Sequence, residues 1–140
     1  RFLQEKEVIV VDHIDYYNYG AYIGKTVKVK GDVDLRGLGL TKLPINFTEV
    51  SGYFDCSENQ LTTLEGCPKE VGEDFRCSCN KLTSLVGSPE EVGRNFFCYE
   101  NELTSLEGAP KEVGEDFDCR NNPLKSFEGK PKYIGGEFRK

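Results

Sequence analysis

A chain of 140 residues is long enough for one domain, and its composition, 37% hydrophobic and 30% charged, favours a thin, elongated core over a large globular one. The net charge of −6 counts against a general nucleic-acid-binding protein, which usually carries a basic patch. No apolar run approaches the roughly 18–20 residues that cross a membrane, and no signal peptide is visible, so no membrane partner is expected.

The first 28 residues do not repeat, and we expect residues 1–28 to form an N-terminal cap. The alternation of Val27 and Val29 indicates one or two strands, and we expect a helical turn near 13–19. The single histidine, His13, has no nucleophile pattern beside it, so we expect an ordinary cap residue. Four tyrosines either pack within the cap or form a contact surface, and both interpretations remain open: Tyr16, Tyr17, Tyr19 and Tyr22.

Beyond the cap, the chain repeats itself every 21 residues over 29–140. Residues 29–49 form a degenerate first unit, because Leu38 stands where later units carry asparagine. The later units are 50–70, 71–91, 92–112 and 113–133, followed by the partial unit 134–140. Positions 21 residues apart form columns, and the most constant columns hold asparagine at 59, 80, 101 and 122, cysteine at 56, 77, 98 and 119, and phenylalanine at 54, 75, 96, 117 and 138.

The unit has the pattern V-G-x-x-F-x-C-x-x-N-x-L-T-S-L-x-G-x-P-x-E. The F-x-C alternation predicts a short strand with both side chains on one face, and stacked units would pair these strands into a parallel sheet. The asparagine follows where the chain turns, so its amide can bond backbone groups of its own and neighbouring units in a ladder. The leucines return to the same core, and glycine and proline mark corners. Because one unit cannot bury its own core face, several must stack.

The stretch F-x-C-x-x-N-x-L-x-x-L matches the leucine-rich repeat pattern L-x-L-x-x-N-x-L-x-x-L, with phenylalanine and cysteine in two leucine places. Over residues 29–140 the chain resembles the short, 21-residue leucine-rich repeats of bacteria and of large tailed phages, with runs such as LTSLEGAPKEVG. The resemblance implies a leucine-rich-repeat solenoid with a short parallel β-sheet, mostly irregular return segments and an N-terminal cap. It also implies a binding module, because this family mostly supplies binding surfaces.

The similarity to phage-encoded repeats further implies a partner in the host cell. We expect a bacterial host or defence protein, bound and inhibited in the cytoplasm of the bacterial host cell. Two alternatives remain open. One is an acidic inhibitor that mimics nucleic acid and occupies a DNA- or RNA-binding protein, which predicts strongly salt-dependent binding. The other is a structural or adhesion module of a larger phage protein.

The six cysteines invite a disulfide or zinc interpretation, but their spacing favours neither. Four of them fall in one inward-facing column, where a buried thiol behaves as a small hydrophobe. A linear column does not converge on a tetrahedral metal site, and a disulfide directly across parallel strands is unusual. Cys67 and Cys79 break the column and are expected at corners or on the surface. No metal or cofactor is expected.

Catalysis has little support in the sequence. No nucleophile is paired with a base, and the repeated V-G dipeptide is a corner and not a phosphate-binding loop. The carboxylates recur as decoration of the repeat, in runs such as PKE and GED, where solvated surface charges are the ordinary outcome. We therefore expect a binding protein and no enzyme.

Constant columns are expected to form the core, and variable ones to face water or a partner. In leucine-rich repeats the outer strand face is the usual recognition surface. Phe97 and Tyr99 lie side by side near the middle of the array with charged neighbours, an arrangement typical of a binding hot spot, although scattered surface aromatics are the alternative. The candidate partner-binding residues are Tyr53, Asp55, Asp74, Arg76, Phe97, Tyr99, Asp118 and Arg120.

Overall fold

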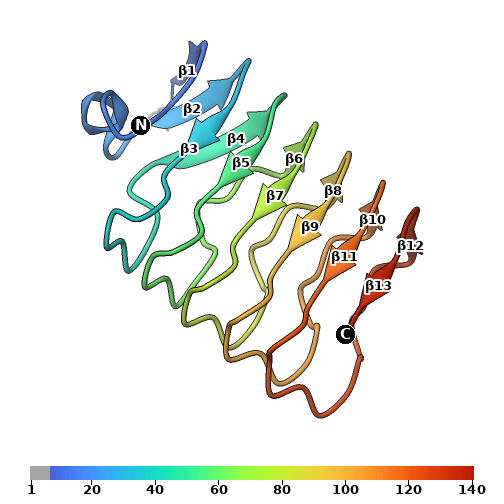
Figure 1. The fold of residues 1–140 in the computed structure, drawn as a ribbon. Coiled ribbons are helices and arrows are strands. Elements are labelled where there is room, and N and C mark those ends of the chain that lie inside the picture. Colours follow the sequence, from blue (N-terminus) through green and yellow to red (C-terminus); the bar gives the residue numbers. More distant parts are fainter. Residues whose placement is uncertain (1–6) are drawn as a thin grey trace, which may run out of the picture.

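The computed structural model describes residues 7–140, which form a parallel β-solenoid of about six turns (Figure 1). Two parallel sheets run along it. The seven-stranded sheet contains β1 (Val8–Val11), β2 (Thr26–Val29), β4 (Asn46–Val50), β6 (Glu70–Val71), β8 (Glu91–Val92), β10 (Glu112–Val113) and β12 (Tyr133–Ile134). The six-stranded sheet contains β3 (Val33–Asp34), β5 (Phe54–Asp55), β7 (Phe75–Arg76), β9 (Phe96–Phe97), β11 (Phe117–Asp118) and β13 (Phe138–Arg139).

The strand predicted at the F-x-C motif is confirmed, and these strands form the six-stranded sheet with equivalent residues paired, as in Phe75 opposite Phe96. The second strand of each repeat is not predicted by the pattern. The V-G dipeptide was expected to be a corner, whereas its valine closes a two-residue strand, such as Glu91–Val92, and only the glycine turns. The F-x-C motif places two apolar side chains two residues apart, whereas Val92 has Glu90 and Arg94 at those distances, so no period-two alternation marks its strand.

The glycine after each of these valines lies where successive turns of the backbone approach closely. A Cβ atom on Gly93 would lie 2.0 Å from the carbonyl oxygen of Gly72, the equivalent residue of the preceding turn. No side chain fits at that distance, so glycine is required for the turn that joins the two sheets.

The core consists of columns of identical side chains stacked along the solenoid axis. Phe54, Phe75, Phe96 and Phe117 are fully buried, and their rings stack with centroids 5.1–5.4 Å apart. Each ring is nearly parallel to the next, with interplanar angles of 5–14°. The short strand spacing of a parallel sheet imposes this stack, because equivalent side chains recur at every turn.

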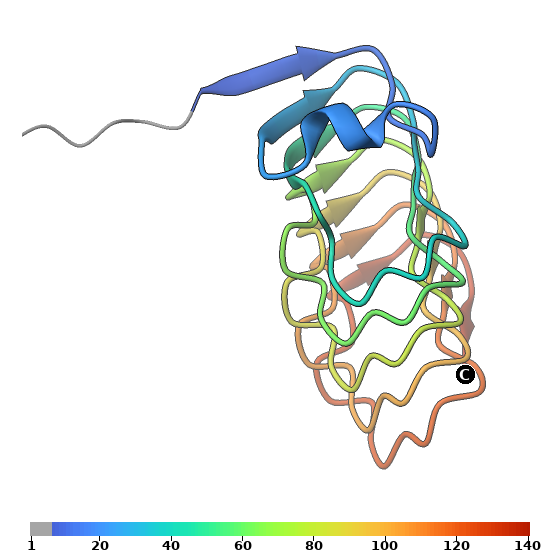
Figure 2. The same ribbon diagram turned by 90° about the vertical axis from the view of Figure 1, so that its left-hand side faces the viewer.

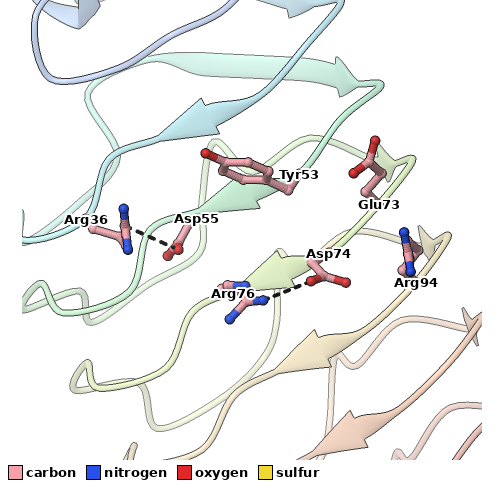
Figure 3. A pocket seen from close by; sticks show the side chains of 7 residues that line it. All are labelled: Arg36, Tyr53, Asp55, Glu73, Asp74, Arg76 and Arg94. Carbon is pink, nitrogen blue, oxygen red and sulfur yellow. Dashed lines mark hydrogen bonds and ion pairs between the residues drawn. The ribbon is translucent and has the colours of Figure 1, made fainter.

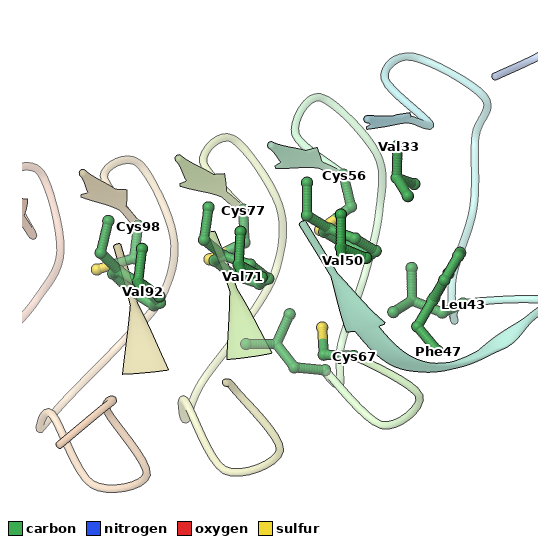
Figure 4. Packing of buried hydrophobic residues seen from close by; sticks show 14 of the residues in the cluster. Val33, Leu43, Phe47, Val50, Cys56, Cys67, Val71, Cys77, Val92 and Cys98 are labelled. Carbon is green, nitrogen blue, oxygen red and sulfur yellow. The ribbon is translucent and has the colours of Figure 1, made fainter. Parts of the chain in front are cut away.

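The predicted cysteine column is confirmed as part of this core. Cys56, Cys77 and Cys98 are fully buried free thiols that lie beside the valines of the facing sheet (Figure 4). Cys67 lies at a corner, which was one of the two positions expected, but the surface alternative is wrong, because this thiol is buried. The corner at Gly66, with a φ of 95°, turns the next side chain toward the core, where the thiol packs as an apolar group.

The predicted asparagine ladder is also confirmed. The Asn101 side-chain oxygen accepts the amide of Leu82 at 3.1 Å, and its nitrogen donates to the carbonyls of Cys77 and Cys98 at 3.0 and 3.1 Å. Asn59, Asn80 and Asn122 repeat these contacts in their own turns. One amide thereby satisfies buried backbone groups in two successive turns of the solenoid.

We expect Asn101→Ala to lower the free energy of unfolding by about 1–3 kcal/mol, because it leaves buried backbone groups without partners. Chemical denaturation of the two proteins measures the difference. Asn122→Ala is the matched control, since Asn122 is only half-buried and water can replace its amide. Equal losses in the two variants would contradict the role given to burial.

The N-terminal segment contributes two strands and a short helix. β1 extends the seven-stranded sheet at one end, and the 3₁₀ helix η1 (Tyr19–Tyr22) lies at the same end of the solenoid (Figure 2). The helical turn therefore lies later than the expected 13–19. Tyr19 and Tyr22 pack against the core, whereas Tyr16 and Tyr17 are exposed. Residues 1–6 of the expected cap lie outside the described residues.

Helix is nearly absent, as predicted, since η1 is the only helix between residues 7 and 140. None of the described residues belongs to a helix that is long and apolar enough for a membrane span.

Candidate protein-interaction face

Alternate residues of the short strands point away from the core and together form the outer face of the six-stranded sheet. Strand register aligns their side chains in three rows along the solenoid. All the candidate residues predicted from sequence lie on this one face. The central row comprises Asp55, Arg76, Phe97 and Asp118, with Tyr53 and Asp74 in the preceding row and Tyr99 and Arg120 in the following row.

Phe97 and Tyr99 form an aromatic pair in the middle of the face. Their ring centroids lie 6.1 Å apart in an edge-to-face arrangement, and both side chains are half-buried. The guanidinium carbon of Arg76 lies 4.7 Å from the centroid of the Phe97 ring, within the range of a cation–π interaction. The aromatic pair therefore carries a cation on one side and leaves only part of each ring open to a partner.

Three arginines on this face, Arg36, Arg76 and Arg120, each pair with the aspartate two residues earlier in the chain. Arg120 donates from Nε and Nη2 to the two carboxylate oxygens of Asp118 at 3.0 and 2.7 Å. Arg36 binds Asp34 in the same two-bond manner, and this contact lowers the pKa of Asp34. The pairing holds each guanidinium in place at the surface, where its remaining N–H groups stay available.

Two of the aspartates predicted to bind a partner are nearly buried, which differs from the expectation that variable positions face water or a partner. Asp118 is 2% exposed and Asp55 is 6% exposed. Asp55 accepts the amide and the hydroxyl of Ser57 through one oxygen, and its other oxygen lies 3.5 Å from Nε of Arg36. Both carboxylates are thus bonded to residues of the same chain, because the residue two positions later, Ser57 or Arg120, lies on the same side of the sheet.

The preceding row contains a second side-chain ladder that the sequence pattern does not reveal. Asp74 accepts the amide of Asn95 at 3.0 Å, and Asn95 accepts the amide of Asp116 at 2.9 Å. Asp32 accepts the amide of Tyr53 at 2.9 Å in the same way. The signal for it was the recurrence of aspartate or asparagine in this column, interrupted by Tyr53. Asp74 is therefore in part a structural residue.

A surface hollow of about 350 Å³ lies on this face, and Arg76, which also contacts the Phe97 ring, is part of its lining (Figure 3). Burial raises the pKa of Tyr53 in its wall. Three lining residues were not predicted from sequence, namely Arg36, Glu73 and Arg94; the others are Tyr53, Asp55, Asp74 and Arg76.

The outer face of the seven-stranded sheet is acidic. Its strand pairs place Glu49, Glu70, Glu91 and Glu112 directly opposite one another on successive strands. The Nζ of Lys28 lies 3.5 Å from Glu49 at one end of this glutamate row. Like charges directly opposite each other are destabilising, so other interactions of the fold must offset the repulsion among these glutamates.

No group of three or more His, Cys, Asp or Glu side chains within residues 7–140 is arranged to hold a metal ion. Comparison of the chain with protein-family models, with curated proteins and with solved structures gives no match. The face presents aromatic rings, paired guanidinium groups and carboxylates.

Proposed function

We propose that the chain is a leucine-rich-repeat protein that binds another protein through the outer face of its six-stranded sheet. The family assignment is supported by the 21-residue period, the strand at F-x-C and the asparagine ladder. Stacked repeats present a continuous, rigid row of variable side chains, and such surfaces are what solenoid proteins use for binding.

One observation carries the binding proposal, namely the aromatic pair in the middle of the face, where Arg76 lies against the Phe97 ring and arginines pair with neighbouring aspartates. Aromatic and arginine side chains at the centre of a patch, surrounded by a polar rim, are the usual composition of an interface hot spot. Phe97 and Tyr99 are held between neighbouring turns, so binding would immobilise few side chains.

The partner is proposed to be a bacterial host protein, bound in the cytoplasm of the host cell and inhibited by occupation of its surface. This part rests on the resemblance of the repeats to those of bacteria and tailed phages. It requires no nucleic acid, membrane or cofactor.

The double substitution Phe97→Ala with Tyr99→Ala tests the proposal. Capture of a partner from bacterial lysate by the immobilised protein is expected to be lost, because the variant removes the centre of the contact. Thermal stability is expected to fall little, since both rings are half-buried. Tyr133→Ala, on the outer face of the seven-stranded sheet, is the matched control and should keep full capture.

A double variant that melts far below the parent protein and still captures the partner would overturn the assignment of this face. Equal loss of capture in Tyr133→Ala would instead place the contact on the other sheet.

The glutamate row supports a second candidate function, an acidic mimic of nucleic acid that occupies a DNA- or RNA-binding protein. Its carboxylates recur at the strand spacing of about 4.8 Å, a dense line of negative charge comparable with a phosphate backbone. Repeating the capture at high salt separates the two candidates. A mimic loses its partner steeply as salt rises, whereas a contact centred on the aromatic pair depends on salt only modestly.

A further inference from the structure

The face contains a position where a carboxylate is missing from a recurring arrangement. In the second repeat Asp55 accepts both the amide and the hydroxyl of Ser57, two residues later. Asp118 likewise accepts the amide and side chain of Arg120. In both repeats, therefore, the carboxylate of the central row accepts hydrogen bonds from the residue two positions later in the chain, which lies in the following row.

The third repeat keeps the serine and loses the carboxylate. Ser78 is the equivalent of Ser57, but Arg76 replaces the aspartate, and a guanidinium has no acceptor to offer. Ser78 is 2% exposed, and its Oγ is the only buried side-chain nitrogen or oxygen among the described residues without a hydrogen-bond partner. Such an unpaired buried group is unusual in a folded protein.

The unpaired hydroxyl belongs to the binding face and not to the core. Phe75 and Cys77 are fully buried on the inward side, so the alternation of the strand places Arg76 and Ser78 together on the outward side. In the following row Ser78 has Ser57 on one side and Tyr99 on the other. Arg76, two residues before Ser78, lines the surface hollow and lies against the Phe97 ring.

We propose that a carboxylate of the partner protein, from an aspartate or glutamate side chain, takes the vacant place and binds the hydroxyl of Ser78 and the guanidinium of Arg76. This inference rests on the proposed function and specifies the chemistry of its partner. Arg76 is 42% exposed and is bonded to Asp74 through one nitrogen, which leaves further N–H groups free to donate. Because Ser78 is covered, an exposed neighbour must move, and Arg76 is held only by Asp74 and Phe97.

The chain's own contacts indicate a carboxylate more strongly than a neutral acceptor. On this face carboxylates already make both halves of the proposed contact, to a serine hydroxyl in Asp55–Ser57 and to a guanidinium in Asp118–Arg120. A single carboxylate has two oxygens and can accept both kinds of donor at once. The nearby carboxylates of Asp55 and Asp74 lie against Arg36 and Arg76, so the partner's carboxylate would share the Arg76 guanidinium with Asp74.

An NMR titration tests the site without the natural partner. N-acetyl-glutamate N-methylamide is added to the ¹⁵N-labelled full chain at constant ionic strength, with N-acetyl-glutamine N-methylamide as the neutral control. Only the acid is expected to shift the Ser78 amide and Arg76 Nε signals in a saturable way. Ser78→Ala should lower the affinity for the acid by about ten-fold, which is the usual effect of losing one charge-assisted hydrogen bond. Ser57→Ala should leave the affinity unchanged, because that hydroxyl is already bonded to Asp55.

The same two variants give a second measurement that needs no ligand. Ser78→Ala is expected to raise the melting temperature, because it removes an unpaired buried hydroxyl, whereas Ser57→Ala should lower it. Equal shifts with the acid and the amide would overturn the inference, as would a fall in melting temperature for Ser78→Ala as large as that for Ser57→Ala.

The two proposals can fail separately. A captured partner that depends on Phe97 and Tyr99 but binds Ser78→Ala unchanged would overturn the carboxylate site and leave the proposed function standing. Saturable binding of the acid that depends on Ser78, with no captured protein, would support the site and count against the proposed function.

Discussion

Phe96→Ala is expected to lower the free energy of unfolding by about 3–5 kcal/mol, the usual cost of deleting a fully buried phenylalanine side chain. The Phe96 ring is fully buried, and it stacks on Phe75 and Phe117 with centroid distances of 5.1 Å on both sides. Removing it leaves a cavity in the middle of the stack. The neighbouring rings cannot close this cavity, because the strand spacing holds them in place.

Chemical denaturation of the parent and variant proteins measures this loss. Phe97→Ala is the matched control, since it deletes the same side chain one residue later on the outer face. The Phe97 side chain is only half-buried, so the fall in the free energy of unfolding is expected to be much smaller. A larger cost for Phe97→Ala than for Phe96→Ala would show that the inward and outward sides of the strand have been exchanged.

Raising the pH above about 9 is expected to destabilise the protein steeply. Burial raises the pKa of the thiols of Cys56, Cys67, Cys77 and Cys98 well above the ordinary value of 9.0. In the unfolded chain these thiols lose their protons near pH 9, whereas in the folded chain they keep them. The folded state then binds more protons than the unfolded state, so stability falls as pH rises.

The stability from each thiol is fully present below pH 9.0 and is lost as the pH rises toward the raised pKa of the folded state. Each thiol that stays protonated only in the folded chain contributes a loss of about 1.4 kcal/mol per pH unit. Melting temperatures measured between pH 8 and pH 11 check this. Cys98→Ala should make the fall in stability with pH less steep by the contribution of one thiol. An unchanged slope would show that Cys98 does not contribute.

The inward side of the solenoid could be predicted almost completely from the sequence. Residues such as Phe96, Cys98 and Asn101 recur at a fixed interval because each turn must present the same shape to its neighbours. A column that holds the same residue type in every unit indicates that packing constrains this position. The burial of Cys67 was missed because its column varies, so no recurrence marked it as a core position.

The outer face could be predicted only in part. The gathering of Phe97, Tyr99 and Arg76 follows from register, and register follows from the repeat. The burial of Asp55 and Asp118 does not, because it depends on which side chain lies two residues later and one turn away. The second sheet was missed because each of its two-residue strands contributes one inward apolar residue, such as Val92, without a second apolar residue two positions away.

By itself, the sequence determined the period, the F-x-C strands, the inward columns and the near absence of helix. Identical turns must stack on one another, and this requirement places the same residue types at the same positions of every repeat. Only the tertiary structure decided that a second sheet closes the solenoid, that Asp55 and Asp118 bind their own chain, and that the hydroxyl of Ser78 lacks an acceptor. These properties belong to contacts between particular side chains of neighbouring turns. A single repeat does not contain both partners of such a contact, so its pattern cannot specify them.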